Sequence, residues 1–161
     1  MNKLYSILAT LLLFSLSSLV SGSMQQCTEK DWSLTAKIAR ETQVPILVLF
    51  TAVECSYCEK LKHEVLEPLF LDDHENRLAV VREIDINSGG KMTDFDGDSI
   101  RSRRFKDRYK VFATPTLMIL DNEGSPLTGP IIGYNSVEQY QTLLESALEK
   151  SRMELRNAEL P

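Results

Sequence analysis

The sequence is short of the residue types that mark metal-binding, fibrous and disordered chains. Its 161 residues include 3 cysteines, 2 histidines, 7 glycines and 6 prolines, too little glycine and proline for a fibrous or disordered chain. A structural zinc site needs four ligands, and beyond one close pair of cysteines only Cys27, His63 and His74 remain, none of them in a second pair. At this length we expect one domain with a single core.

The chain also lacks an excess of positive charge. Its formal net charge is −5, which disfavours a nucleic-acid partner, because phosphate binding requires a concentrated basic surface. One local basic run is present, consisting of Arg101, Arg103, Arg104, Lys106, Arg108 and Lys110. Its members fall at helical spacing with few aromatic residues between them, so a solvated helix face is the better interpretation.

A single long apolar run lies at the start of the chain. A short positive start is followed by an uncharged, leucine-rich run over residues 4–20 and by small residues at 21–23. This order predicts a secretory signal peptide over residues 1–22, with cleavage after Gly22 or Ser23. The alternative is an uncleaved membrane anchor, because the run is at the short end of the ~17 to 25 residues that span a bilayer.

The remainder divides into a leader, one domain and a tail. We predict a polar leader over residues 23–33, a folded domain over 34–150 and a tail over 151–161. Cys27 in the leader is an odd thiol, which either pairs with another molecule or is incidental. Trp32 is expected to pack under the first helix, whereas His63 and His74 fall on polar helix faces and are expected at the surface.

Periodic patterns in the domain predict interleaved helices and strands. The continuous apolar run 46–50 is typical of a central strand covered on both faces. The helix over 59–70 has one apolar face, and Pro68 is expected to bend it. The other predicted elements are a helix over 35–42, a strand over 78–86, a turn over 87–90, an acidic loop over 91–98, a helix over 99–109, a strand over 116–120, a hairpin turn over 121–124 and a strand over 130–133.

The last helix carries a start signal and a buried face. Ser136 and Gln139 form a capping box at its beginning. The predicted buried stripe consists of Val137, Tyr140, Leu143, Leu144, Ala147 and Leu148. From Met153 to Pro161 this stripe is lost, so we expect a frayed tail there.

Two cysteines lie at the predicted junction between the strand over 46–50 and the helix that follows it, in the segment Cys55-Ser56-Tyr57-Cys58. At the amino end of a helix, unpaired backbone N–H groups and the helix dipole favour a thiolate over a thiol. Thiols so placed have pKa values of roughly 3.5 to 7.5, against about 8.5 for a free cysteine. The pattern therefore predicts Cys55 as a nucleophile that attacks a partner disulfide, and Cys58 as the thiol that resolves the mixed disulfide.

Other interpretations of the acidic and cysteine residues are weaker. A static structural disulfide is conceivable in an exported protein, but a ring this small constrains the unfolded chain little. Asp94, Asp96 and Asp98 alternate like the start of a calcium loop, yet the glycine is misplaced and no bidentate glutamate follows. A solvated loop is favoured there, and no metal or cofactor is expected.

The order of strand, Cys-x-x-Cys, helix and, later, Ala113-Thr114-Pro115-Thr116 resembles the thioredoxin superfamily over about residues 34–150. The resemblance implies an α/β thioredoxin fold, a central mixed sheet flanked by helices, with an inserted loop and helical stretch before the proline. In that superfamily the proline at the position of Pro115 follows a cis peptide bond beside the cysteines. Thr114 and Pro115, with Ser56 and Tyr57 between the cysteines, are then the expected substrate contacts.

Within the superfamily the chain is most similar to exported bacterial proteins of the SoxW type. The residues that carry this similarity are Cys55-Ser56-Tyr57-Cys58, His63-Glu64-Val65-Leu66, Phe95-Asp96-Gly97 and Ala113-Thr114-Pro115-Thr116. The resemblance implies a monomeric periplasmic thiol-disulfide oxidoreductase that reduces disulfides of client proteins and receives electrons from a membrane donor. A disulfide oxidase or isomerase and a non-enzymatic binding module remain the alternatives.

The chain departs from ordinary thioredoxin at two positions. Glu54 precedes the first cysteine where thioredoxin has tryptophan, and Leu49 stands where it has a buried aspartate. Without that acid, proton transfer from Cys58 needs water or another group, for which Glu54 is a candidate. The negative charge of Glu54 also tends to raise the pKa of Cys55, opposing the helix.

Overall fold

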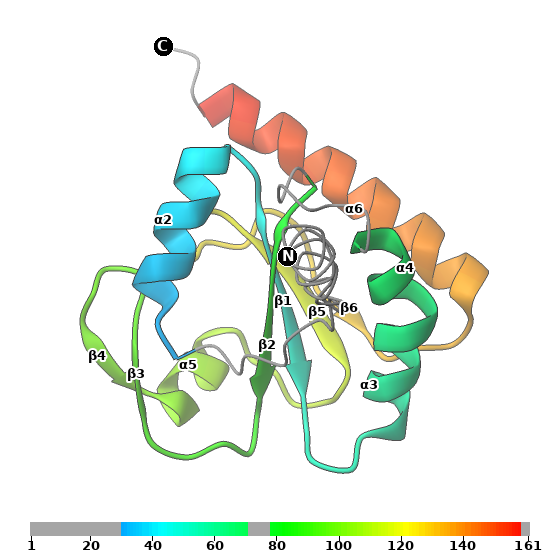
Figure 1. The fold of residues 1–161 in the computed structure, drawn as a ribbon, viewed down its shortest axis with the longest axis horizontal. Coiled ribbons are helices and arrows are strands. Elements are labelled where there is room, and N and C mark those ends of the chain that lie inside the picture. The colour runs from blue at the N-terminus through cyan, green and yellow to red at the C-terminus, as the bar shows by residue number, and fades with distance from the viewer. Residues whose placement is uncertain (1–29, 71–77, 159–161) are drawn as a thin grey trace, which may run out of the picture.

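A four-stranded mixed sheet forms the centre of the molecule (Figure 1). The computed structural model describes residues 30–70 and 78–158. The strands are β1 (Ile46–Thr51), β2 (Val80–Asp85), β5 (Thr116–Leu120) and β6 (Ile131–Ile132), in the spatial order β2-β1-β5-β6. β1 runs parallel to β2 and antiparallel to β5, and β6 is antiparallel to β5. The predicted α/β thioredoxin fold with a mixed sheet is confirmed.

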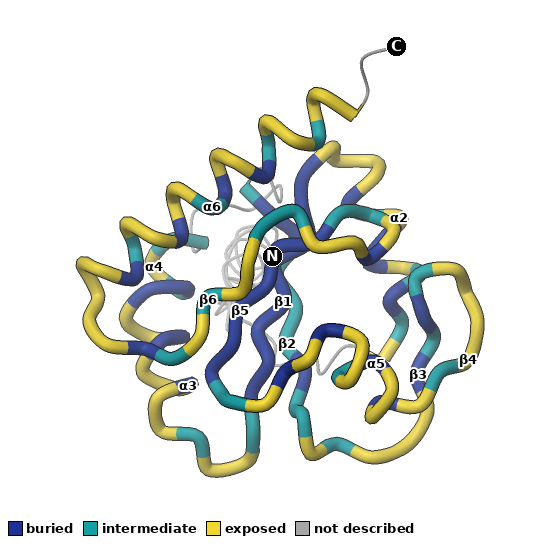
Figure 2. Tube along the Cα trace, turned by 180° about the vertical axis from the view of Figure 1, so that it is seen from behind, coloured by how far each residue is buried: buried dark blue, intermediate teal, exposed yellow. Residues whose placement is uncertain are grey.

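Helices cover both faces of this sheet, as the prediction required. They are α2 (Trp32–Thr42), α3 (Ser56–Leu61), the π-helical turn η1 (Lys62–Leu66), α4 (Glu67–Phe70), α5 (Ser102–Arg108) and α6 (Val137–Ala158). One core lies between the sheet and α2 with α5, and the other lies between the sheet and α3, η1 and α6. In Figure 2 the buried residues, drawn in dark blue, lie mainly along the central strands and on the side of α6 that faces them.

β1 is the central strand because both of its faces are buried. All of its residues are buried, and successive side chains point to opposite faces of a strand. Ile46, Val48 and Phe50 enter the core under α2, while Leu47 and Leu49 enter the core under α3 and α6. The segment that follows this apolar run, residues 52–58, therefore starts at the end of a fully buried strand.

The helix that follows the cysteines is longer and less regular than predicted. It begins at Ser56 rather than at residue 59, and its middle widens into η1 directly before Pro68. Within that turn the N–H of Glu67 donates to the carbonyl of Lys62, five residues back. Since Pro68 has no N–H, the carbonyl of Glu64 loses its α-helical partner, so the proline perturbs the helix where the sequence predicted a bend.

The segment before the loop of Thr114 and Pro115, called the proline loop below, contains a hairpin that the sequence analysis missed. β3 (Lys91–Thr93) pairs antiparallel with β4 (Ser99–Arg101), where an acidic loop and the start of a helix were expected. α5 is correspondingly shorter, and Arg101 and Lys110 of the basic run lie outside it. The ring of Phe105 stacks on Trp32 with centroids 4.5 Å apart, so the insertion packs against α2.

The expected aspartate loop and basic helix face are joined by an ion pair. Asp94 is 7% exposed and receives two hydrogen bonds from the guanidinium of Arg108, one of them 2.9 Å long. Arg108 is therefore not part of a fully solvated face. Burial alone raises the pKa of Asp94, but the hydrogen bonds from Arg108 and from the N–H of Phe95 outweigh it and lower that pKa.

α6 corrects the prediction of a frayed tail. The helix continues to Ala158, and Ser151 is fully buried. The side-chain oxygen of Ser136 accepts a hydrogen bond from the N–H of Gln139 at 3.4 Å, as expected of a cap. Val137 and Leu143, assigned to the buried stripe, are exposed instead, because α6 contacts the core along a narrower face.

Several predictions fall outside the described residues. These are the signal peptide over 1–22, most of the leader over 23–33, Cys27 and His74.

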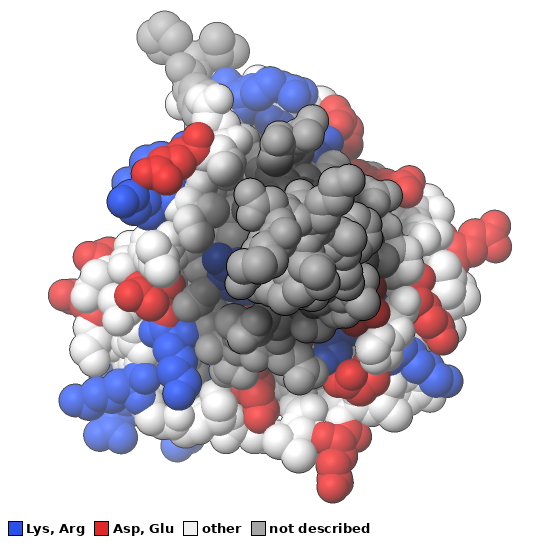
Figure 3. Space-filling view, in the orientation of Figure 1, with Lys and Arg blue, Asp and Glu red and all other residues white. Residues whose placement is uncertain are grey.

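None of the helices within residues 30–70 and 78–158 is both long and apolar enough to cross a lipid bilayer. On the face shown in Figure 3, acidic and basic side chains are interspersed around the residues drawn in grey.

Candidate active site

Cys55 and Cys58 form a disulfide where β1 gives way to α3. β1 ends at Thr51, and the N–H of Cys55 donates to the carbonyl of Ala52 at 3.3 Å, which closes a tight turn. Glu54 within this turn has φ of 60°, a left-handed conformation that non-glycine residues adopt infrequently. This turn projects Cys55 from the end of a buried strand onto the amino end of a helix.

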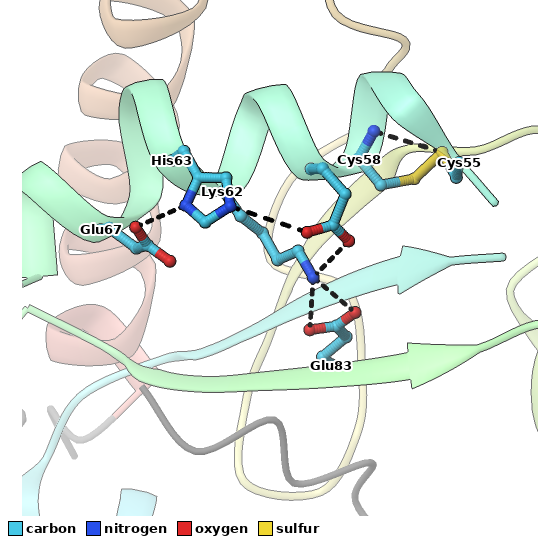
Figure 4. A network of polar contacts seen from close by, with 7 residues as sticks. Cys55, Cys58, Lys62, His63, Glu67 and Glu83 are labelled. Atoms are coloured by element: carbon cyan, nitrogen blue, oxygen red, sulfur yellow. Dashed lines mark hydrogen bonds and ion pairs between the residues drawn. A yellow bond between two sulfur atoms is a disulfide. The ribbon is translucent and has the colours of Figure 1, made fainter. Parts of the chain in front are cut away.

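The helix terminus supplies a hydrogen bond to the first sulfur. Cys55 is the N-cap of α3, and the N–H of Cys58 donates to Sγ of Cys55 at 3.2 Å (Figure 4). Cys55 is partly exposed, whereas Cys58 is 1% exposed. Cys55 is thus the more accessible of the two sulfurs, and the roles of nucleophile for Cys55 and resolving thiol for Cys58 stay predictions.

A buried cation lies one helical turn beyond Cys58. The side chain of Lys62 is 5% exposed, and its Nζ lies 2.7 Å from Glu59 and 3.3 Å from Glu83 (Figure 4). Burial by itself lowers the pKa of Lys62, but the hydrogen bond to Glu59 and the charge of Glu83 outweigh it and raise that pKa. The ammonium is therefore held charged beneath the helix that carries both cysteines.

Glu83 places a carboxylate beside Leu49, which stands where ordinary thioredoxin has a buried aspartate. In the β1–β2 register Leu49 pairs with Glu83, so the two residues lie on neighbouring strands and share one face of the sheet. The sequence analysis missed both Glu83 and Lys62. Two signals could have found them. Glu83 is a charged residue within the predicted strand 78–86, and Lys62 lies four residues after Cys58 on an apolar helix face.

The proline loop lies at the same edge of the sheet as the cysteines. The peptide bond between Thr114 and Pro115 is cis. Phe50 pairs with Thr116 across β1 and β5, so the segment leaving β1 and the segment entering β5 are adjacent. The N–H of Gly133 donates to the carbonyl of Pro115 at 2.8 Å, which ties the loop to β6.

Exposed side chains surround these two loops. Tyr57 is 58% exposed, with Nζ of Lys60 5.9 Å from its ring centroid, and Ser56 is also exposed. Val53 and Phe112, which the sequence analysis did not single out, are 72% and 81% exposed. Large apolar side chains in water near a redox pair provide a surface on which an unfolded or extended segment can bury apolar groups.

The histidine and aspartates do not gather into a metal site. His63 is exposed, with Nδ1 2.8 Å from Glu67 and Nε2 3.8 Å from Glu59. Within residues 30–70 and 78–158 there is no group of three histidine, cysteine, aspartate or glutamate side chains placed to hold a metal ion.

A mixed sheet that ends in a Cys-x-x-Cys disulfide at a helix amino terminus, next to a cis-proline loop, defines a thiol-disulfide oxidoreductase of the thioredoxin type. The chain belongs to the family described as the thioredoxin-like domain, whose model matches residues 32–148. No curated protein sequence is significantly similar to it.

Solved structures share the fold at low sequence identity. A thioredoxin-fold protein from Helicobacter pylori has 18% identity and a TM-score of 0.52, over 72% of this chain and 86% of its own. The DsbH oxidoreductase has 19% identity and a TM-score of 0.56, over 75% and 83%. The carboxy-terminal domain of Neisseria meningitidis DsbD in its oxidised form has 16% identity and a TM-score of 0.52, over 71% and 90%.

Proposed function

We propose that this protein is an exported reductase of protein disulfides that acts in the periplasm. The observation that carries the proposal is the asymmetry of the sulfur pair. Cys55 is accessible and receives the N–H of Cys58 at 3.2 Å, while Cys58 is buried behind it. A hydrogen bond to sulfur favours the thiolate, so in the reduced protein we expect the pKa of Cys55 below the value of about 8.5 for a free thiol.

The reaction proceeds by two exchanges at sulfur. The Cys55 thiolate attacks one sulfur of a client disulfide, the client S–S bond breaks, and the departing client thiolate takes up a proton. Cys58 then loses its proton and attacks Sγ of Cys55, which releases the second client sulfur as a thiolate that also takes up a proton. The client gains two electrons and two protons, and the protein is left with the Cys55–Cys58 disulfide seen in the structure.

The proton of Cys58 requires an acceptor, because Leu49 supplies none. Glu54 is our proposed group for this transfer, since it stands next to Cys55 in the exposed turn. The charges of Lys62, Glu59 and Glu83 already compensate one another. The proton of Cys58 is therefore passed to the exposed carboxylate of Glu54 rather than to this ion network. Transfer through water to Glu54 fits the openness of the turn.

Client binding is proposed at the proline loop and the residues between the cysteines. Thr114 and Pro115 lie at the sheet edge that Phe50 and Thr116 bring together, which supports backbone pairing of Thr114 with an extended client segment. Tyr57 and Ser56 present side chains to the same solvent face, with Tyr57 able to cover an apolar client residue. An extended, disulfide-bonded segment is the client shape that these features fit.

Return to the reduced state needs a dithiol donor outside the chain. Export is supported by the signal pattern over residues 1–22, and the resemblance of the sequence to exported proteins of the SoxW type supports a membrane electron donor of the disulfide-reducing type. A monomer exchanging its disulfide with such a donor and then with clients completes the proposed cycle.

The test of this proposal combines a potential with a trap. We expect the Cys55–Cys58 couple, equilibrated in glutathione buffers, to have a potential near the value of about −270 mV for thioredoxin, whereas about −120 mV would indicate an oxidase. Cys58→Ala should accumulate mixed disulfides with periplasmic clients, and Cys55→Ala is the matched control that should trap none. If Cys58→Ala traps no client while Cys55 still reacts with iodoacetamide, a non-enzymatic binding module replaces the proposal.

A further inference from the structure

The basic run of the sequence lies at the end of the sheet that carries the cysteines. α5, which holds most of the run, is at the same end of the molecule as the start of α3 (Figure 1). Lysine and arginine side chains gather over α5 and β4, at the lower left of Figure 3. In a chain with a net charge of −5, this gathering of cations is a local reversal of the overall charge.

Four exposed cations make up this region, which we call the basic surface. They are Lys91, Arg101, Arg104 and Lys110. None of the four is in an ion pair with another residue of the described ranges 30–70 and 78–158. Two other arginines of the run differ, because Arg103 lies 3.9 Å from Asp107 and Arg108 is hydrogen-bonded to Asp94. The basic surface therefore carries positive charge that the described part of the fold does not compensate.

Two of these cations lie opposite each other in the β3–β4 hairpin. Lys91 pairs directly with Arg101 in the antiparallel register, and like charges directly opposite each other destabilise such a pair. The register places this pair at the open end of the hairpin. The exposed aspartates Asp96 and Asp98 lie at the other end, in the turn, so they leave the repulsion in place. A carboxylate of a bound partner would relieve it.

Lys110 occupies a backbone position that favours glycine. It follows Tyr109, the C-cap of α5, and has φ of 53°. The N–H of Lys110 donates to the carbonyl of Asp107 at 3.1 Å, and the N–H of Val111 donates to the carbonyl of Lys106 at 3.4 Å. These are the two bonds of a Schellman motif, in which the left-handed residue is usually glycine. A side chain in this conformation costs backbone energy, so stability does not account for a lysine here.

The basic surface leads directly into the proline loop. Lys110 precedes Thr114 by four residues, so their Cα atoms are at most about 14 Å apart even if the chain between them is fully extended. Phe112, 81% exposed, stands between them. An extended segment that pairs with Thr114 reaches the basic surface within about four of its own residues, because a strand rises about 3.3 Å per residue.

We propose that the basic surface binds an acidic segment of the client protein, a few residues from the cysteine that Cys55 attacks. The inference rests on the proposed reductase function and adds to it the charge of the client. A short acidic segment fits better than an anionic membrane, because the Debye length of about 8 Å at physiological salt confines the attraction to nearby groups. An extended anionic surface would also face the acidic side chains that lie elsewhere on the same face in Figure 3.

The first experiment compares two synthetic peptides, each with one internal disulfide, flanked by glutamates in one and by glutamines in the other. The reduced whole protein is mixed with each peptide, and loss of the peptide disulfide after acid quenching gives a second-order rate constant. Each constant is divided by that of the same peptide with dithiothreitol, which corrects for intrinsic reactivity. At an ionic strength of about 0.01 M we expect the glutamate peptide to react about tenfold faster. Equal rates would overturn the proposal.

Salt provides a test on the unaltered chain. In 1 M sodium chloride, where the Debye length is about 3 Å, the preference for the glutamate peptide should fall to less than about twofold. The rate of the glutamine peptide should change little over the same range. A tenfold preference that persists in 1 M salt would show that the attraction is not electrostatic and would overturn the proposal.

Variants assign the preference to the basic surface. Lys110→Gly removes the charge and the strain together, so we expect the preference for the glutamate peptide to fall about threefold while the melting temperature is equal or higher. Arg104→Gln should also lower the preference about threefold. Lys150→Gln is the control, because Lys150 is an exposed lysine on α6, which packs on the other face of the sheet from α5. An unchanged preference in the double variant of Lys110→Gly and Arg104→Gln would overturn the proposal.

The outcomes separate this inference from the proposed function. Reduction of both peptides at one rate would overturn the basic surface as a client site and leave the reductase intact. If neither peptide is reduced, the reductase proposal fails, and a cysteine-free, fluorescent glutamate peptide then tests the surface on the oxidised protein by anisotropy. Binding that Lys110→Gly weakens supports the surface, and no binding overturns it. Binding only to vesicles of neutral lipid with phosphatidylglycerol would replace the acidic segment by a membrane and overturn the proposal.

Discussion

The ammonium of Lys62 lies 3.3 Å from the carboxylate of Glu83, beneath the helix that begins after Cys55. Glu83 in turn pairs with Leu49 across β1 and β2, and Leu49 stands where ordinary thioredoxin has a buried aspartate. The carboxylate on this side of the sheet is therefore supplied by β2, and its charge is neutralised by Lys62 from the helix. Such a pair holds the helix against β2 because separating its members leaves an uncompensated charge.

We predict that Lys62→Met lowers the free energy of unfolding by about 2 to 4 kcal/mol, less than for a fully buried pair because Glu83 and Glu59 are partly exposed. Urea unfolding measures this change. Lys37→Met is the matched control, since Lys37 makes an exposed pair with Glu41 at 3.9 Å and should cost no more than about 0.5 kcal/mol. A loss in Lys62→Met as small as in the control would show that the network does not hold the helix.

The same pair has a defined pH dependence. The pKa of Lys62 is raised above 10.5 in the folded protein, so its contribution is complete below that value and is lost as the pH rises through the folded pKa. We therefore expect the difference in stability between wild type and Lys62→Met to be constant from pH 7 to 9 and to shrink above pH 10.5. A difference that stays constant through that range would contradict the assignment.

Asp94→Asn should loosen the inserted hairpin. Arg108 is 40% exposed in its side chain and Asp94 9%, and loss of charge-assisted hydrogen bonds of this kind costs about 1 to 3 kcal/mol. The pKa of Asp94 is lowered from 3.8, so its contribution is present above that value and lost as the pH falls through the folded pKa. Unfolding at pH 7 and at successively lower pH should show wild type and variant converging in acid.

Gly124→Ala should destabilise the turn after β5 more than Gly133→Ala. Both glycines have positive φ, 84° and 79°, so an alanine costs about 1 to 2 kcal/mol of backbone strain at either position. At Gly124 an added Cβ would also lie 2.5 Å from the ring of Phe95, whereas nothing lies within 4 Å at Gly133. We expect about 2 to 4 kcal/mol at Gly124, measured by thermal unfolding, because overpacking adds to the strain. Equal losses would mean that Phe95 moves aside freely.

Glu54→Gln should lower the pKa of the Cys55 thiol in the reduced protein, because the negative charge of the neighbouring Glu54 disfavours the thiolate. The pH dependence of iodoacetamide reaction at Cys55 in Cys58→Ala measures this pKa. Glu59→Gln, one turn into the helix, is the comparison that separates Glu54 from general removal of negative charge. A rise in the Cys55 pKa would contradict the electrostatic role of Glu54.

Patterns local to the sequence were sufficient for the strands of the central sheet and for the position of the sulfur pair. The run 46–50 is apolar at every position, which only a strand covered on both faces requires, and it is the central strand β1. The place of Cys55 and Cys58 at the start of a helix could be predicted from the sequence, and the two residues form a disulfide there. The hairpin β3–β4 was missed because its strands are three residues long and carry polar side chains, so no alternation could mark them.

Contacts between distant residues explain the other differences. Arg108 looked like one member of a solvated basic face until the fold brought Asp94 to it, and Arg152 looked like part of a tail until α6 brought it beside the end of α2. α6 extends to Ala158 and buries Ser151, whereas the apolar periodicity of the sequence ends before Met153.

The sequence by itself determined the class of fold and the reacting atoms, because buried strands, helix starts and a Cys-x-x-Cys pair are set by neighbours in the chain. Only the tertiary structure decided the electrostatic surroundings of those atoms. Charge interactions depend on distance through space, and Lys62 with Glu83, or Asp94 with Arg108, are residues far apart in sequence that only folding brings together.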